Sequence, residues 1–185
     1  MTARAGRARL LAAVAGAVMI LGVQAAGEDP GFMPKGGRAL LLAMAGSPPD
    51  AGELRNIVQA RRTEAEWRAF VAARGKTLSD RELDTLAAYL AVNMPLSADV
   101  AKRSDLAKAL PADGRDLAWN QCQFCHSLFT SHLMQVREAQ GWRNIFLSPF
   151  HREMKMSPQE REEFARYSAL NMPMKIEDVP PDLRF

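Results

Sequence analysis

The chain contains 185 residues, of which 48% are hydrophobic, so it is long enough for one domain of average size or for two small domains with packed cores. It has 24 lysine and arginine residues against 21 aspartate and glutamate residues, which gives a formal net charge of +3. Because the sequence contains no basic tract and no nucleic-acid-binding motif, we expect no nucleic-acid partner.

The first 25 residues are typical of a secretory signal peptide. Arg4, Arg7 and Arg9 form a basic start, residues 10–23 are apolar, and residues 23–25 precede a plausible cleavage point. The apolar run has 14 residues, whereas a membrane-spanning helix needs about 20. We therefore expect a periplasmic protein that is attached to the membrane only if the signal stays uncleaved. Cleavage would leave 21 basic against 21 acidic residues.

From residue 36 onward the chain repeats itself. Four landmarks recur in the same order 75 to 78 residues later: Gly37-Arg38 with Gly114-Arg115, Trp67 with Trp142, Ser79 with Ser157, and Asn93-Met94-Pro95 with Asn171-Met172-Pro173. Ordered landmarks at nearly one offset predict two tandem copies of one small domain. The alternative is that the first half is only a helical support of similar pattern. The expected organisation is a signal peptide over 1–25, a leader over 26–35, a first domain over 36–95, a linker over 96–110, a second domain over 111–175 and an extended tail over 176–185.

Both halves have the patterns of helices. Ser or Thr followed three residues later by Glu forms a capping box at Thr63, Ser79 and Ser157, each directly before a helical pattern of apolar residues. The helix that begins near Ser79 is expected to stop before Pro95, because the residue before a proline is pushed out of the helical region. No strong alternating pattern predicts a sheet, so the expected fold class is all-α.

Cys122, Cys125 and His126 form a C-x-x-C-H sequence, which is the attachment signature of c-type haem. Two thiols at this spacing can form thioethers with the two vinyl groups of one porphyrin, and the histidine that follows can ligate the iron. The motif predicts one covalently bound haem c. A disulfide or a thioredoxin-like pair is the alternative, but the adjacent histidine and the lack of a βαβ pattern argue against it. A zinc site would need further ligands, and only His132 and His151 remain.

The first copy lacks this motif. Alignment of the two copies places Ala45, Pro48 and Pro49 opposite the two cysteines and the histidine. We therefore expect no covalent haem in the first domain. Our hypothesis is an ancestral two-haem protein that lost its first site.

The second half resembles the class I c-type cytochromes. The resemblance rests on a C-x-x-C-H sequence at the start of a small helical unit, a helix that begins near Trp142, and a helix with the Ser157–Glu160 capping box that ends near Tyr167. The layout is most similar to the small haem domains of sulfite dehydrogenases and quinohaemoprotein amine dehydrogenases. The resemblance covers about residues 111–175 and implies an all-α fold, a covalently held haem c and electron transfer in the periplasm.

The family also implies a second iron ligand from a loop on the far side of the haem, usually a methionine. Residues 148–156 form a loop that is three residues longer than its counterpart in the first copy. Met154 is the favoured ligand, with His151 and Met156 as alternatives. Met172 is a fourth candidate, but Met94 repeats it in the copy without a haem motif. Methionine would give a higher reduction potential than histidine.

The remaining histidine, His132, is expected to lie at the surface or to face a haem propionate rather than to bind the iron. Several aromatic residues are expected to line the haem pocket or to belong to the ordinary core: Trp119, Phe124, Phe129, Trp142 and Phe146.

These features predict a monohaem electron-transfer protein that is not itself an enzyme. It would serve as a periplasmic carrier or as the cytochrome subunit of a dehydrogenase, with a redox protein as its partner. The alternative is a haem-based sensor or ligand-binding protein whose sixth iron position is open. A haem peroxidase ranks last, because no distal histidine and arginine occur at a suitable spacing.

Overall fold

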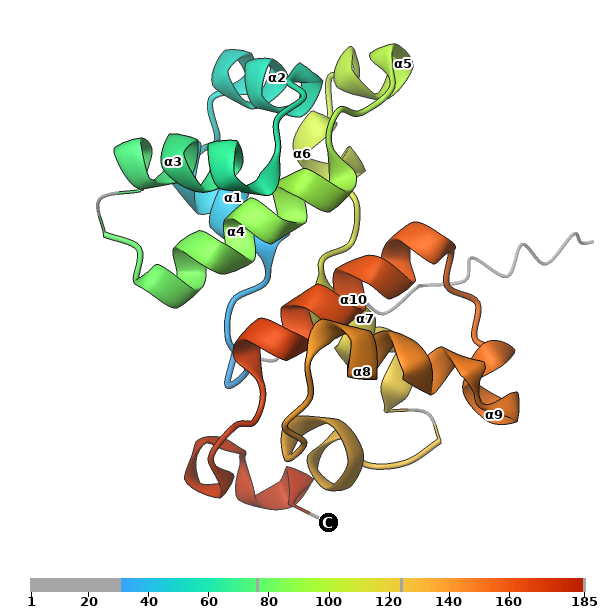
Figure 1. Cartoon of the computed structure of the whole chain (residues 1–185). Coiled ribbons are helices and arrows are strands. Elements are labelled where there is room, and N and C mark those ends of the chain that lie inside the picture. The colour runs from blue at the N-terminus through green and yellow to red at the C-terminus, as the bar shows by residue number, and fades with distance from the viewer. Residues whose placement is uncertain (1–30, 76, 124, 185) are drawn as a thin grey trace, which may run out of the picture.

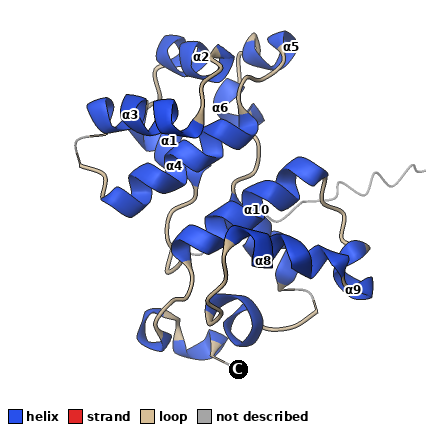
Figure 2. Ribbon diagram, in the orientation of Figure 1, coloured by secondary structure: helices blue, strands red, loops and turns tan. Residues whose placement is uncertain are grey.

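The computed structural model describes residues 31–75, 77–123 and 125–184, and the signal peptide predicted for 1–25 lies outside this part. The described part is built of helices and loops and has no strand (Figure 2), so the fold is all-α, as the sequence predicts. No helix in these ranges has the length and apolar character needed to span a membrane.

The described residues of the first half form six helices (Figure 1): α1 (Gly37–Met44), α2 (Ala51–Gln59), α3 (Glu64–Arg74), α4 (Asp80–Asn93), α5 (Ala98–Ala101) and α6 (Leu106–Ala109). Their buried apolar side chains form one hydrophobic cluster that extends from Leu40 to Leu110. The residues expected to form a linker are part of this cluster, because Ala101 and Leu106 of the two short helices are buried in it.

Four α-helices lie in the second half, within residues 111–123 and 125–184: α7 (Gly114–Leu117), α8 (Ala139–Asn144), α9 (Pro149–Arg152) and α10 (Pro158–Asn171). Shorter helical turns lie between and after them: the π-helical turns Ala118–Cys122 and Phe129–Leu133, and the 3-10 turns Ile145–Leu147, Ile176–Asp178 and Pro181–Leu183. A second hydrophobic cluster contains Leu117, Phe164 and Val179, and Met33 from the expected leader also packs in it.

The C-terminal segment is not extended, so that expectation is wrong. Two helical turns form there, and Val179 between them is 1% exposed. The proline pair predicted an extended chain, but burial of an apolar side chain against the second cluster favours a folded segment.

The predicted helix starts are confirmed. The capping boxes at Thr63, Ser79 and Ser157 all form, with each side chain and its Glu partner bonding reciprocally to backbone N–H groups. Helix α4 ends at Asn93, before Pro95, as the sequence predicts. Both α4 and α10 have 14 residues.

Helices α4 and α10 lie against each other at the centre of the molecule (Figure 1). Helix α4 also packs on α1 and α3, so it is buried on more than one face. Two buried polar contacts cross the junction of α4 and α10: Asn93 donates to the Glu163 carboxyl group at 3.2 Å, and Asn171 donates to the Thr85 hydroxyl at 3.0 Å. These contacts fix the alignment of the two helices, because a shift would leave buried polar groups without partners.

Candidate functional site

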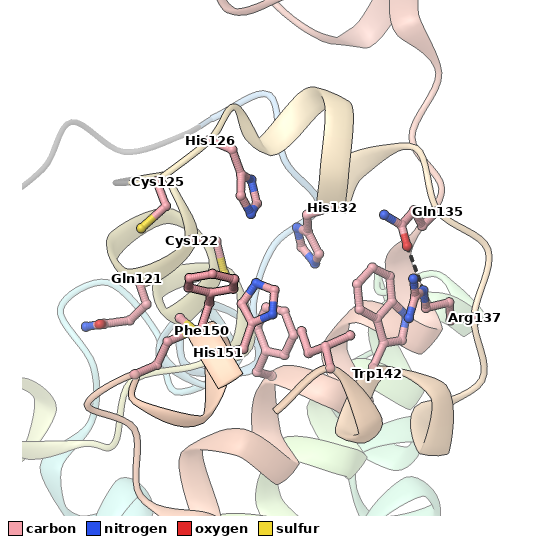
Figure 3. A pocket seen from close by; sticks show the side chains of 13 residues that line it. Gln121, Cys122, Cys125, His126, His132, Gln135, Arg137, Trp142, Phe150 and His151 are labelled. Atoms are coloured by element: carbon pink, nitrogen blue, oxygen red, sulfur yellow. Dashed lines mark hydrogen bonds between the residues drawn. The ribbon is translucent and has the colours of Figure 1, made fainter. Parts of the chain in front are cut away.

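A cavity of about 430 Å³ opens in the second half of the molecule (Figure 3). This volume is in the range of about 300–1,000 Å³ that is typical of small-molecule and cofactor sites. Its lining includes Cys122, Cys125 and His126, so the structure brings all three residues of the C-x-x-C-H sequence to one cavity. The other lining residues are Gln121, His132, Gln135, Arg137, Trp142, Ile145, Phe150, His151, Met154 and Phe164.

The two cysteines are free thiols at one end of the cavity (Figure 3). Cys122 ends the π-helical turn that continues α7, and such turns occur frequently at functional sites. Burial, with a smaller contribution from Cys125, raises the pKa of Cys122 to about 12. A thiol with this pKa is protonated at neutral pH, whereas redox-active cysteine pairs have lowered pKa values. Cys122 therefore lacks the lowered pKa of a reactive thiolate.

The loop after α8 supplies the wall opposite His126. His151 on α9 and Met154 after it both line the cavity. Met156 does not: it is 6% exposed and belongs to the second hydrophobic cluster. Met172 is buried in the same cluster and does not line the cavity either. Of the four candidate ligands from this half, the structure brings two to the site.

Arg161 on α10 fixes the shape of this loop. Its guanidinium donates to the backbone carbonyl oxygens of Arg152, Met154 and Met156, at 2.9, 3.1 and 3.1 Å. The guanidinium also lies over the Phe146 ring, 5.0 Å from its centroid. Sequence reasoning did not identify this residue, because an arginine in the first turns of a helix is ordinarily a solvated surface residue.

His132 is buried, so the expectation of a surface position is wrong. The ring is 3% exposed and stacks on Phe164, with 5.1 Å between the ring centroids. Ser168 donates its hydroxyl hydrogen to the Phe164 carbonyl, so its oxygen accepts from His132 Nε2–H at 2.8 Å. Burial lowers the pKa of His132 to about 4, which keeps the ring neutral.

The aromatic lining is only partly as expected. Trp142 lines the cavity, whereas Trp119 and Phe129 line a separate cavity of about 190 Å³. Phe146 packs in the second cluster against Phe164, and Phe124 lies outside the described residues. Phe164 and Phe150 complete the apolar wall, and sequence reasoning missed both. Phe150 is 89% exposed, so it forms an open edge of the cavity.

The residues present fit a haem group. The walls are apolar, and the two thiols and the His126 imidazole are near one end (Figure 3). At the other end Arg137 and Trp142 provide hydrogen-bond donors, and the buried Trp142 Nε1–H has no partner among the described residues. The vinyl groups of a haem and its two carboxylates lie on different edges of the ring. The thiols at one end of the cavity suit the vinyl groups, and the hydrogen-bond donors at the other end suit the carboxylates. No group of three or more His, Cys, Asp or Glu residues in the described ranges is arranged to hold a bare metal ion.

Comparison with protein-family models, with curated proteins and with solved structures gives no match for this chain.

Proposed function

We propose that this chain is a monohaem c-type cytochrome that transfers single electrons. The observation that supports this function is the convergence of Cys122, Cys125 and His126 on one largely apolar cavity of suitable volume. The two cysteines would hold the haem covalently, and His126 would be its proximal iron ligand. When bound, the haem iron supplies a one-electron redox couple. The apolar lining would limit the access of water to the iron, which adjusts its potential.

The second axial ligand in this proposal comes from residues 148–156. Met154, which the sequence favours, and His151 both line the cavity, so both remain candidates on position alone. A ligand on each side of the iron suits electron transfer, because neither oxidation state then binds a substrate.

We also propose that the chain consists of two tandem cytochrome c-like units, of which the first has no haem. Equivalent contacts in the two halves support this organisation. Gly37 lies against Tyr89 where α1 crosses α4, and Gly114 lies against Tyr167 where α7 crosses α10. Each tyrosine hydroxyl also donates to a proline carbonyl that lies just before the first helix of the other half. Tyr89 donates to Pro111, before α7, and Tyr167 donates to Pro34, before α1.

Electrons would pass through the exposed edge of the site. Cys125 is exposed, and the Phe150 ring is 89% exposed at the mouth of the cavity. A redox protein, either a dehydrogenase or a terminal acceptor, would dock over this edge. The predicted signal peptide supports a periplasmic location, where covalent haem attachment is expected to occur.

The test is expression of the full chain with the machinery for c-type haem attachment, followed by an assay for haem that stays bound after denaturation. Wild type should retain one haem per chain. Cys122→Ser and Cys125→Ser should weaken or abolish covalent attachment, and His126→Ala should abolish stable holoprotein. Met156→Leu is the matched control, because Met156 is buried beside the site without lining it. Wild type without covalent haem would contradict the proposal.

Carbon monoxide added to the reduced holoprotein then distinguishes a carrier from a sensor. An unchanged Soret band means that the iron is closed on both sides, as electron transfer requires. Rapid and tight binding would mean an open sixth position and would favour the sensor function instead.

A further inference from the structure

We propose that the His151 imidazole, rather than the Met154 thioether, is the second axial ligand, so that the haem is held by two histidines. This inference rests on the proposed function. It identifies the ligand that sets the reduction potential, and it departs from the methionine that the family resemblance implies.

The first argument is the separation of the two imidazoles. The rings of His126 and His151 both line the cavity, with 6.2 Å between their centroids and 81° between their planes. Figure 3 shows them entering the cavity from opposite sides. Metal–imidazole bonds are about 2 Å long, so two rings on either side of one ion have their centres roughly 6 Å apart. The chain already holds the two side chains at that separation.

The second argument is the protonation of His151. The Ser148 hydroxyl donates its only hydrogen to the Ile145 carbonyl at 3.0 Å. Its oxygen must therefore accept from the histidine, so His151 Nδ1 is the protonated nitrogen in the 2.9 Å contact with Ser148. This tautomer leaves Nε2 with a free lone pair, which is the form that binds a metal. A hydrogen-bond acceptor behind the other ring nitrogen is the usual arrangement for a metal-binding histidine.

The neighbouring candidates have other partners. Met154 is half-buried and its side chain packs against the second hydrophobic cluster, which is the ordinary role of a methionine. His132 also lines the cavity, but its Nε2 donates to Ser168, its ring is stacked on Phe164, and no contact with the His126 ring is found among the described residues. His151 alone among these three combines a place on the cavity wall, an opposing imidazole and a hydrogen bond that fixes its tautomer.

The first experiment uses wild-type ferric holoprotein and needs no variant. Electron paramagnetic resonance and near-infrared magnetic circular dichroism distinguish iron bound by two imidazoles from iron bound by an imidazole and a thioether. We expect the two-imidazole signature. A thioether charge-transfer band in wild type would overturn the inference and would leave the proposed function intact.

The second experiment compares three variants of the same loop. His151→Ala should lose the two-imidazole signature, and its ferrous iron should bind carbon monoxide faster than wild type. His151→Met should raise the reduction potential, because a methionine ligand gives a higher potential than histidine. Met154→Leu should retain the wild-type spectrum. Loss of the axial ligand in Met154→Leu but not in His151→Ala would overturn the inference.

Ser148→Ala tests the positioning of the ring. It removes the acceptor for Nδ1–H and so weakens the hold on the ring. We expect the wild-type ferric signature together with a Soret shift on addition of carbon monoxide to the reduced protein, which wild type does not show. No response to carbon monoxide in Ser148→Ala would contradict the assigned tautomer. Absence of covalent haem from wild type would instead refute the proposed function, so the two failures are distinguishable.

Discussion

At the scale of single residues, Glu163 is a buried carboxyl group whose pKa is raised. Its side chain is 3% exposed on α10, where it accepts from the Gly114 backbone N–H at 3.1 Å and from Asn93 at 3.2 Å. Burial, together with repulsion from Asp113, outweighs these hydrogen bonds and raises the pKa of Glu163 to about 8. The folded protein therefore keeps a proton on this group at neutral pH.

This shift predicts a pH dependence of stability. Between the ordinary pKa of 4.5 and about 8, folded Glu163 holds a proton that the unfolded chain has released, so the free energy of unfolding should fall as the pH rises through this window. Glu163→Gln should remove this part of the fall, measured by urea unfolding at several pH values. Glu153→Gln, at an exposed carboxylate, should show the wild-type profile. Equal slopes in wild type and Glu163→Gln would contradict the prediction.

At the scale of elements, the two close helix crossings depend on glycine. A Cβ added at Gly37 or Gly114 would overlap the Cβ of Tyr89 or Tyr167 respectively, so the helices could not keep their present approach. Each tyrosine is buried and also bonds through its hydroxyl to a backbone carbonyl, so it cannot readily move aside. The crossings of α1 with α4 and of α7 with α10 are therefore sensitive to a single methyl group.

Gly114→Ala should lower the free energy of unfolding by about 1–3 kcal/mol, the usual cost of overpacking in a core. The matched control is Gly141→Ala on α8, where the added Cβ would make only an ordinary contact of 3.4 Å with Arg137. There the better helix propensity of alanine should stabilise the protein by up to about 1 kcal/mol. Urea unfolding of both variants measures the difference, and equal effects would refute this account of the crossing.

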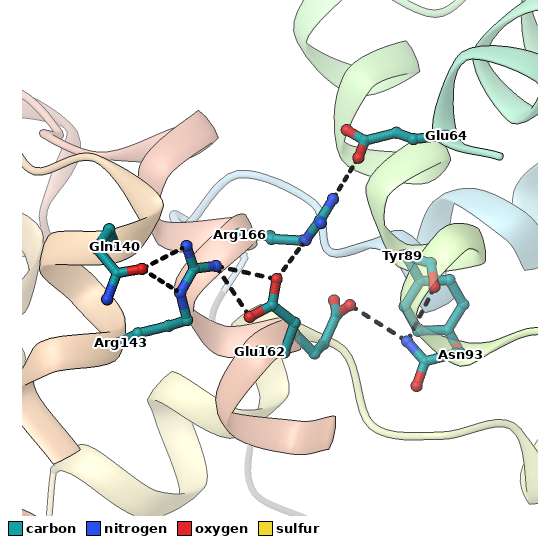
Figure 4. A network of polar contacts seen from close by, with 8 residues as sticks. Glu64, Tyr89, Asn93, Gln140, Arg143, Glu162 and Arg166 are labelled. Atoms are coloured by element: carbon teal, nitrogen blue, oxygen red, sulfur yellow. Dashed lines mark hydrogen bonds and ion pairs between the residues drawn. The ribbon is translucent and has the colours of Figure 1, made fainter. Parts of the chain in front are cut away.

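At the scale of the whole molecule, both buried polar contacts and surface ion pairs join the two halves. One Asp113 oxygen accepts from the Asp116 backbone N–H of α7 at 3.0 Å, and the other accepts from the backbone N–H groups of Arg38 and Ala39 of α1. One buried carboxylate thus caps a helix in each half. At the surface, Arg166 pairs with Glu64 of α3 and with Glu162, which also pairs with Arg143 of α8 (Figure 4). Such half-exposed pairs contribute little.

Asp113→Ala should lower the free energy of unfolding by about 1–4 kcal/mol, because each of the two lost helix caps costs about 0.5–2 kcal/mol. The control is Asp105→Ala: Asp105 also precedes a helix, but its side chain makes no capping bond and pairs with Arg103 at the surface. That variant should stay within about 0.5 kcal/mol of wild type. Chemical denaturation followed by circular dichroism measures both. A loss for Asp113→Ala as small as that of the control would exclude the double cap.

The sequence alone predicted the helical fold class and the capping boxes, because each depends on residues that are close along the chain. Tertiary structure decided which candidates reach the cavity. Met154 and His151 line it, whereas Met156 turns into the core two residues later, and no local pattern distinguishes these side chains. Tertiary structure also decided that Asp113 caps α1, through a contact with Arg38 that is 75 residues away along the chain. Such contacts depend on how distant helices pack, which is set by shape and burial rather than by spacing along the chain.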